Sequence, residues 1–185
     1  MTIHPDVIRK YSRPVEVATF LETGTYQGTT TLEATRCNFN RIETVELSLT
    51  LYNGSKRRFA ELGMSHLVKF HHGFSPLFLE QVLPTVEGSA FIYLDAHFSG
   101  PTTSGFGQPL PLWDELQAIY KAGRHLDVIA IDDIRLCGTD EHPGWKETTL
   151  QILVEALQTI NSNYVFNLEP GIVPGDVLVA HPGLT

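Results

Sequence analysis

Acidic side chains follow two apolar runs of the sequence, where each run ends. Asp95 comes directly after residues 90–94, and Asp132 with Asp133 follows residues 127–131. Carboxylates gathered at adjacent strand ends repel one another unless a cation or protons compensate their charge. Oxygen ligands of this kind suit Mg²⁺, Ca²⁺ or Mn²⁺, so the three form a candidate cation site. The alternative is that Asp132 or Asp133 caps a loop or helix, as Asp often does.

A glycine-containing turn, Glu-Thr-Gly-Thr-Tyr-Gln-Gly, spans residues 22–28 and ends another apolar run. Gly24 and Gly28 permit close backbone approach and unusual φ angles. A pyrophosphate favours bare backbone amides at a helix start, whereas Glu22 ahead of the turn repels phosphate and attracts a cation. S-adenosylmethionine carries an ammonium and a sulfonium, so Glu22 favours that ligand over a dinucleotide. The alternative is an ordinary strand-to-helix turn.

Two further residues extend this chemistry. Glu46 ends the next run, about twenty residues beyond the turn, where a carboxylate can accept both hydroxyls of a ribose. Taken alone it could equally be a surface glutamate. His97 lies two residues after Asp95. A general base, a metal ligand and a loop-packing histidine are all open roles for it.

Short β-rich runs alternate with helical patterns along the chain, and these elements must position the polar residues. The predicted strands are 15–23, 41–47, 67–72, 90–94 and 127–131, followed by 164–168 and 176–180. The predicted helices are 29–37, 49–62, 75–86, 112–122 and 145–160, with Ser48 as a cap.

This order predicts one α/β domain over residues 1–185 with a doubly wound, mostly parallel seven-stranded sheet. The five strands that alternate with helices should be parallel. The last two are joined by a short turn over 170–175, which predicts a C-terminal antiparallel hairpin. A Rossmann dinucleotide fold would normally finish parallel. Ligands of such sheets bind at the carboxyl ends of the strands, where the acidic residues lie.

Composition narrows the classes of protein. The formal net charge is −8 and no basic stripe is present, which argues against nucleic acid and anionic membrane surfaces as partners. No apolar run is long enough to span a bilayer, and residues 1–14 lack the apolar core of a signal peptide. Two isolated cysteines, Cys37 and Cys137, fit a reduced, cytoplasmic protein.

The chain resembles the class I S-adenosylmethionine-dependent methyltransferases over nearly its whole length. ETGTYQG resembles their first motif, E-x-G-x-x-x-G, and Glu46 in TVELS matches their ribose-binding acidic position. The resemblance implies a Rossmann-like methyltransferase fold that binds S-adenosylmethionine. The implied cofactor contacts are Glu22, Gly24, Thr25, Tyr26, Gly28, Thr29, Glu46, Leu47, Gly73, Phe74, Ser75 and Asp95.

The segments YLDAH and AIDDI resemble the metal-binding strand ends of catechol and macrocin-type O-methyltransferases. Carried over, the ligands of a Mg²⁺ ion are Asp95, Asp132 and Asp133. Two features depart from the pattern. Gly-Phe-Ser at 73–75 replaces a Gly-Asp-Ser near the adenine, and the longer N-terminal segment that covers the substrate is lacking. We therefore expect residues 1–14, 98–111 and 135–146, or a second subunit of a homodimer, to form the acceptor site.

Three functions are compatible with these residues. The first is metal-assisted O-methylation of a small-molecule hydroxyl, with His97 or the neighbouring Asp95 as catalytic residues that take the proton. The second is another metal-dependent reaction on the same fold. The third is a non-catalytic module that binds S-adenosylmethionine. A sugar, a phenol and a small carboxylate are all open as acceptors.

Overall fold

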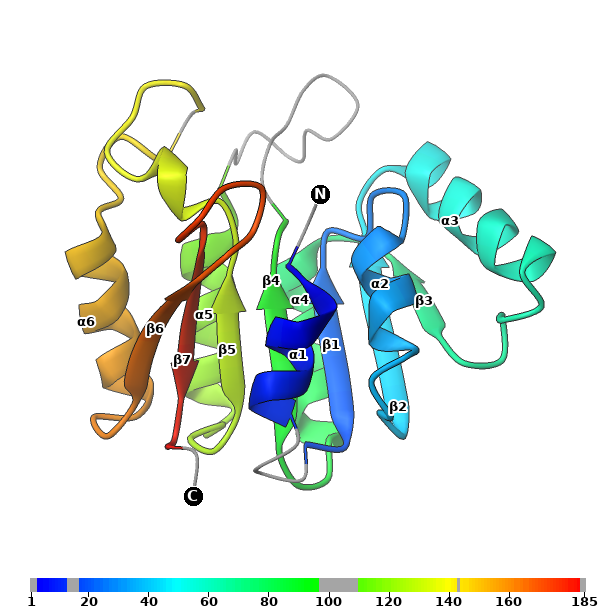
Figure 1. Cartoon of the computed structure of the whole chain (residues 1–185), viewed down its shortest axis with the longest axis horizontal. Coiled ribbons are helices and arrows are strands. Elements are labelled where there is room, and N and C mark those ends of the chain that lie inside the picture. Colours follow the sequence, from blue (N-terminus) through cyan, green and yellow to red (C-terminus); the bar gives the residue numbers. More distant parts are fainter. Residues whose placement is uncertain (1–2, 13–16, 97–109, 143, 184–185) are drawn as a thin grey trace.

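A single seven-stranded sheet forms the centre of the molecule, with the strand order β3-β2-β1-β4-β5-β7-β6 (Figure 1). The computed structural model describes residues 3–12, 17–96, 110–142 and 144–183. The strands are β1 (Thr19–Thr23), β2 (Arg41–Glu46), β3 (Lys69–His72), β4 (Ala90–Leu94), β5 (Val128–Ile131), β6 (Val165–Glu169) and β7 (Val177–His181).

The pairing of these strands confirms the predicted fold class. β1 lies parallel to both β2 and β4, and β3 and β5 extend the parallel part on its two sides. β7 then pairs antiparallel with β5 and with β6, which gives the terminal hairpin. Every residue of β1, β4, β5 and β7 is buried, as expected for strands covered on both faces.

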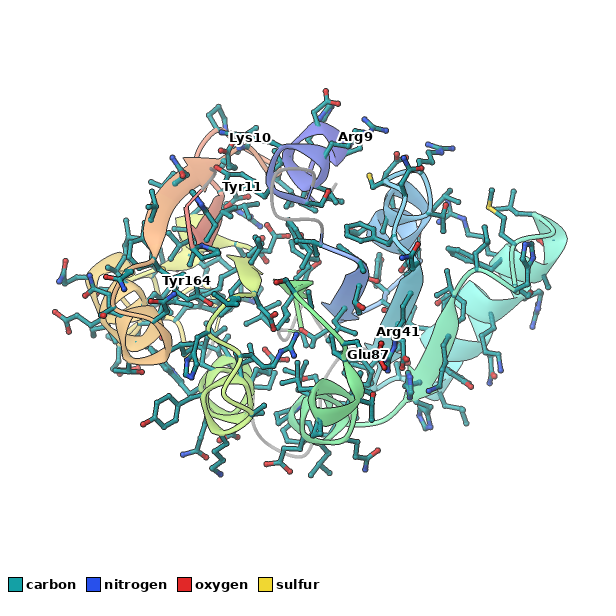
Figure 2. The ribbon with its side chains drawn as sticks, turned by 90° about the horizontal axis from the view of Figure 1, so that it is seen from below. Arg9, Lys10, Tyr11, Arg41, Glu87 and Tyr164 are labelled. Atoms are coloured by element: carbon teal, nitrogen blue, oxygen red, sulfur yellow. The ribbon has the colours of Figure 1, made fainter. Side chains whose placement is uncertain are left out.

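Helices cover both faces of the sheet (Figures 1 and 2). Buried side chains of α1, α2 and α3 belong to one apolar cluster, and those of α4, α5 and α6 to the other. The helices are α1 (Pro5–Ser12), α2 (Thr29–Ala34), α3 (Leu49–Glu61), α4 (Ser75–Val82), α5 (Leu112–Lys121) and α6 (Leu150–Ile160). Among the described residues, none of these helices has the length and apolar character that crossing a bilayer requires.

Helix α1 was not predicted from the sequence. The segment is mostly polar, but the helix has one apolar face, on which Val7, Ile8 and Tyr11 are buried. Lys10 and Tyr11 both bind Glu169 at the end of β6, with the Lys10 ammonium 2.6 Å from the carboxylate. Figure 2 shows Lys10 and Tyr11 on the side of the sheet opposite α4 and α5. The helix therefore attaches the start of the chain to the terminal hairpin.

Several element bounds differ from those predicted, and local chemistry explains the larger differences. The helix predicted over 145–160 begins only at Leu150, because the Thr149 side chain accepts the Ile152 N–H and caps it there. The helix predicted over 75–86 ends at Val82 and continues as a 3-10 turn, Leu83–Thr85, which contains Pro84. β1 begins at Thr19, so Val17 and Ala18 lie outside it.

Glu43 of β2 is buried within a cluster of basic side chains. Its carboxylate lies 2.5 Å from the His71 ring nitrogen, 2.7 Å from Nε of Arg41 and 3.4 Å from the Lys69 ammonium. Burial alone would raise the pKa of Glu43, but the hydrogen bonds from His71 and Arg41 lower it to about 2. The Arg41 guanidinium also donates to the Thr85 carbonyl, 2.8 Å away, and so connects β2 to the segment after α4.

This depressed pKa predicts a loss of stability in acid. Because the pKa of Glu43 is lower in the folded chain than in the unfolded chain, its contribution is complete above about pH 4.5. It is lost as the pH falls towards 2, and the full difference is worth about 3 kcal/mol. The free energy of unfolding, measured with urea at pH 6, 4 and 3, should therefore fall much more steeply with falling pH in the wild type than in Glu43→Gln. Glu87→Gln, at an exposed position, should follow the wild type; equal pH slopes for all three would contradict the prediction.

Candidate functional site

The segments that leave the parallel strands are fastened to one another along one edge of the sheet. The amides of Gly24 and Thr25 donate to the carbonyl of Val45, at 3.0 and 3.1 Å. The Asp95 amide donates to the Thr23 carbonyl at 3.1 Å, and the Asp132 amide donates to the Leu94 carbonyl at the same distance. This edge therefore holds the predicted residues of β1, β2, β4 and β5 in a fixed row, at the upper edge in Figure 1.

Gly24 is required by the protein's own backbone. It has φ +82°, and a Cβ atom there would lie 2.4 Å from the carbonyl oxygen of Asp95 and 3.1 Å from Cα of Ala96. The sequence predicts a close backbone approach at Gly24 and leaves the approaching group open. In the structure the first close neighbour is the end of β4, so Gly24 allows the turn and the Asp95 segment to lie side by side.

Gly28 has a different reason for its residue type. It takes φ +72° at the start of α2, and a Cβ atom would lie 3.0 Å from the ring of Phe59. Phe59 is fully buried on α3. Between the two glycines, Tyr26 also has positive φ, at 47°, and its side chain is 55% exposed. The turn thus packs tightly against α3 while presenting the Tyr26 ring to solvent.

Glu22 is almost completely buried, with 1% of its surface exposed. The hydroxyls of Thr31 and Thr44 donate to its carboxylate, and Thr44 also lies 2.6 Å from the Thr25 hydroxyl. Burial raises the pKa of Glu22 to about 7, although the two hydroxyl donors oppose that shift. The Glu22 carboxyl group therefore lies beneath the turn, held by threonine hydroxyls.

Glu46 holds the turn in place. One carboxylate oxygen accepts the Tyr26 N–H at 2.8 Å, and the other accepts the Ser48 N–H at 2.8 Å. A carboxylate offers about four lone-pair sites, so two sites are left after these bonds. The predicted ribose-binding residue is thus fixed against the glycine turn by the backbone itself and keeps accepting capacity.

The other predicted cofactor contacts surround this pair. Ser75 opens α4 directly after Phe74, whose side chain is half-buried. The Gly73 amide donates to the carbonyl of Glu46 at 3.1 Å, which brings the end of β3 to the end of β2. Leu47 is half-buried, and Thr29 is exposed at the start of α2. All of these residues lie at the carboxyl edge of β1, β2 and β3.

The acidic cluster differs in membership from the predicted cation site. Carboxylate oxygens of Asp132, Asp133 and Asp176 lie within 4.8 Å of one another, and all three residues are buried. Asp95 does not belong to this group, and Asp176 was not among the predicted site residues. The signal for Asp176 lay in the hairpin: Ile131 pairs with Leu178, so the antiparallel register places the residue two before Leu178 beside Asp133.

A guanidinium lies in this cluster. Nη1 of Arg135 donates to the carboxylates of Asp133 and Asp176, and the Arg135 amide donates to Asp176 at 3.2 Å. Asp132 accepts the Tyr93 hydroxyl at 2.5 Å, and its other oxygen is buried without a hydrogen-bond partner among the described residues. Sequence reasoning missed Arg135, although it lies two residues after the Asp-Asp pair.

Electrostatics at the ends of β4 and β5 favour proton uptake in the absence of a ligand. Burial raises the pKa of Asp95 well above its usual range, and the charges of Asp132 and Asp133 raise it further. Burial also raises the pKa of Asp132 to about 6, although the Tyr93 hydroxyl opposes this shift. Bringing a cation near these carboxyl groups would lower both values.

The predicted acceptor segments are described in part. His97 and most of the predicted loop over 98–111 lie outside the described residues. Leu110, Trp145, Asp95 and Asp132 line a small cavity between the ends of β4 and β5 and the start of α5. The amide of Ile3, from the predicted segment 1–14, donates at 3.3 Å to the same Tyr93 hydroxyl that binds Asp132. Residues from all three predicted segments, Ile3, Leu110 and Trp145, therefore lie at the acidic edge of the sheet.

Comparison with solved structures identifies proteins that share this fold. No protein-family model and no curated protein sequence matches the chain. A putative caffeoyl-CoA O-methyltransferase from Staphylococcus aureus matches with a TM-score of 0.63 and 17% identity, over 97% of this chain and 82% of that one. The fold is that of the class I methyltransferases.

Methyltransferase structures with bound SAH match the chain with similar TM-scores. An O-methyltransferase from Bacillus cereus in complex with SAH has a TM-score of 0.62 and 15% identity, over 96% of this chain and 80% of that one. An SAH-bound methyltransferase from Podospora anserina has a TM-score of 0.60 and 20% identity, over 96% and 76%. The methyltransferase fold is shared at these low identities, so residue roles in this chain must come from its own geometry.

Proposed function

We propose that this chain is an S-adenosylmethionine-dependent methyltransferase that methylates a hydroxyl oxygen of a small molecule. The observation that carries the proposal is the contact between Glu46 and the Tyr26 amide, at 2.8 Å. It joins an acidic strand end to a glycine turn, in a sheet whose fold matches that of solved methyltransferase structures. The SAM-bound or SAH-bound states of similar structures support the choice of cofactor.

Each part of the cofactor has a matching group along the sheet edge. The ribose hydroxyls would donate to the free lone pairs of Glu46. Leu47 and Phe74 offer apolar surface for the adenine on either side of the β2 and β3 ends. The methionine part would lie over Gly24 and Thr25, where the buried charge of Glu22 and the carboxyl group of Asp95 favour its positive charges.

The reaction needs placement more than covalent help. The acceptor oxygen attacks the methyl carbon, the bond from carbon to sulfur breaks, and neutral S-adenosylhomocysteine leaves; the hydroxyl proton passes to a base. Holding the acceptor in line with the sulfur supplies much of the rate. Asp95 is the described carboxyl group closest in sequence to the predicted base His97, so these two residues are the candidates for taking the proton.

The resemblance also implies a divalent ion on Asp95, Asp132 and Asp133, which would activate the acceptor oxygen as a Lewis acid when bound. The residues present do not fit this role well. Arg135 already binds Asp133, and the described acidic group excludes Asp95 while including Asp176. No step of the proposed reaction is therefore assigned to a metal ion.

Calorimetric titration tests cofactor binding directly. The purified protein should bind S-adenosylhomocysteine and S-adenosylmethionine at one site per chain. Glu46→Gln should weaken both by about tenfold, since hydrogen bonds to a charged group contribute about 1.5–3 kcal/mol. Glu61→Gln removes a charge at the exposed end of α3 and should bind like the wild type. A folded wild-type protein that binds neither ligand would refute the proposal.

Turnover distinguishes an enzyme from a binding module. Formation of S-adenosylhomocysteine should be followed with a phenol, a sugar and a hydroxylated carboxylic acid as acceptors. An enzyme forms it with one of these classes. Cofactor binding that is unaffected by Asp95→Asn, with no product from any acceptor, would favour the non-catalytic alternative.

A further inference from the structure

The acidic cluster at the ends of β5 and β7 has its own cation. Asp132 and Asp133 follow β5, and Asp176 precedes β7, so two segments distant in sequence contribute the three carboxylates. Their exposed fractions are 4%, 3% and 0%, so solvation by water contributes little to stabilising their charges. A positive charge is required at this position if the group is to be ionised.

Arg135 meets that requirement from within the chain. Its guanidinium donates through Nη1 to Asp133 and to Asp176, and its amide donates to Asp176 as well. The Ile134 amide donates to the Asp176 carbonyl at 2.9 Å, so the backbone holds Arg135 beside both segments. An arginine remains charged at any relevant pH and binds carboxylates with directional N–H groups.

The remaining cluster member is held by a neutral donor. Asp132 accepts the Tyr93 hydroxyl at 2.5 Å, and Tyr93 in turn accepts the Ile3 amide. A divalent ion on Asp132 and Asp133 would have to replace the contact between Arg135 and Asp133 and bring two positive charges near the guanidinium. Repulsion between the guanidinium and the ion opposes binding of that ion.

We propose that Arg135 is the resident cation of the Asp132–Asp133–Asp176 cluster and that it takes the place of a divalent metal ion there. Its structural role is to connect the end of β5 to the start of β7 through its ion pairs with Asp133 and Asp176. This inference concerns cation binding and stability, so it is independent of whether the protein transfers methyl groups.

Titration with Mn²⁺ alone tests the inference, with free Mn²⁺ measured by its paramagnetic resonance signal. The wild type should not bind Mn²⁺ below millimolar concentration. Arg135→Gln removes the charge and should bind one Mn²⁺ per chain at least about tenfold more tightly than the wild type. Arg135→Lys keeps a charge and should resemble the wild type. Arg9→Gln, on α1, removes one positive charge elsewhere in the chain and controls for that loss.

Thermal unfolding supplies a second measurement. Arg135→Gln should unfold at a lower temperature than the wild type, and Mn²⁺ should raise that temperature for Arg135→Gln only. Two results would overturn the inference. One is submillimolar Mn²⁺ binding by the wild type that Asp132→Asn abolishes. The other is a folded Arg135→Gln that binds Mn²⁺ no better than the wild type. If Arg135→Gln does not fold, the wild-type titration with its Asp132→Asn comparison decides.

Discussion

Gly24→Ala is expected to unfold at markedly lower denaturant concentration than the wild type and to lose binding of S-adenosylhomocysteine. An alanine at φ +82° costs about 1–2 kcal/mol in backbone conformation. Its Cβ would also lie 2.4 Å from the Asp95 carbonyl oxygen, which is backbone and cannot rotate away. The turn and the end of β4 must separate, so we expect a total loss of about 3 kcal/mol or more.

Gly63→Ala is the matched control for this prediction. Gly63 follows α3 with φ +71°, and a Cβ atom there would meet no atom within 4 Å. The variant should lose about 1 kcal/mol from conformation alone and should bind S-adenosylhomocysteine normally. Chemical denaturation and calorimetry of the two variants separate the contact with Asp95 from the strain of positive φ. Equal losses in both variants would show that the close approach at Gly24 has no energetic effect.

Glu22→Gln is expected to make the protein more stable and a weaker binder of S-adenosylmethionine. Burial raises the pKa of Glu22 from 4.5 to about 7, so the folded chain holds a proton that the unfolded chain releases. The stability from this group is complete below about pH 4.5 and is lost as the pH rises through 7. The difference corresponds to about 3 kcal/mol, which a neutral amide would not lose at pH 8.

The same substitution removes the buried charge beneath the glycine turn. We expect S-adenosylmethionine to bind Glu22→Gln about tenfold more weakly at pH 8. S-adenosylhomocysteine, which lacks the sulfonium charge, should lose less. Unfolding at pH 5 and pH 8, together with calorimetry of both ligands, measures the two effects. Glu61→Gln should change neither. A Glu22→Gln variant less stable than the wild type at pH 8 would show that its hydrogen bonds to Thr31 and Thr44 outweigh the charge.

The sheet could be predicted from the sequence because its strands are bounded by clear signals. Apolar runs such as 90–94 end in polar residues, and the turn over 170–175 separates the last two strands without room for a helix. Helix starts were less predictable. Trp145 looked like the first residue of a helix, but its side chain is buried while Thr149 caps α6 four residues later. Helix α1 was missed because its apolar face consists of three residues among charged ones.

Some residues of the candidate site could be placed from the sequence, and others could not. Residues that directly follow or end one strand, such as Glu46 and Asp132, could be placed at the carboxyl edge of the sheet from the sequence. Asp176 could not, because it becomes a neighbour of Asp133 only through the antiparallel register of β5 and β7. The two glycines of the turn could not be interpreted from the sequence either. Gly24 makes room for the backbone of Asp95, and Gly28 makes room for the ring of Phe59. A glycine in the sequence therefore indicates that another group lies close to the backbone, but it does not identify that group.

The position of β7 has a consequence for how the sheet is completed. β7 is the last strand in sequence, yet it lies between β5 and β6. Without residues 177–181, β6 would have no neighbouring strand and the edge of β5 would be open. Val177–His181 then closes both gaps, and Asp176 brings the final carboxylate with it. A chain that stops before residue 176 would therefore lack both the complete sheet and one of the two carboxylates that bind Arg135, so the sheet and the acidic site would be completed together.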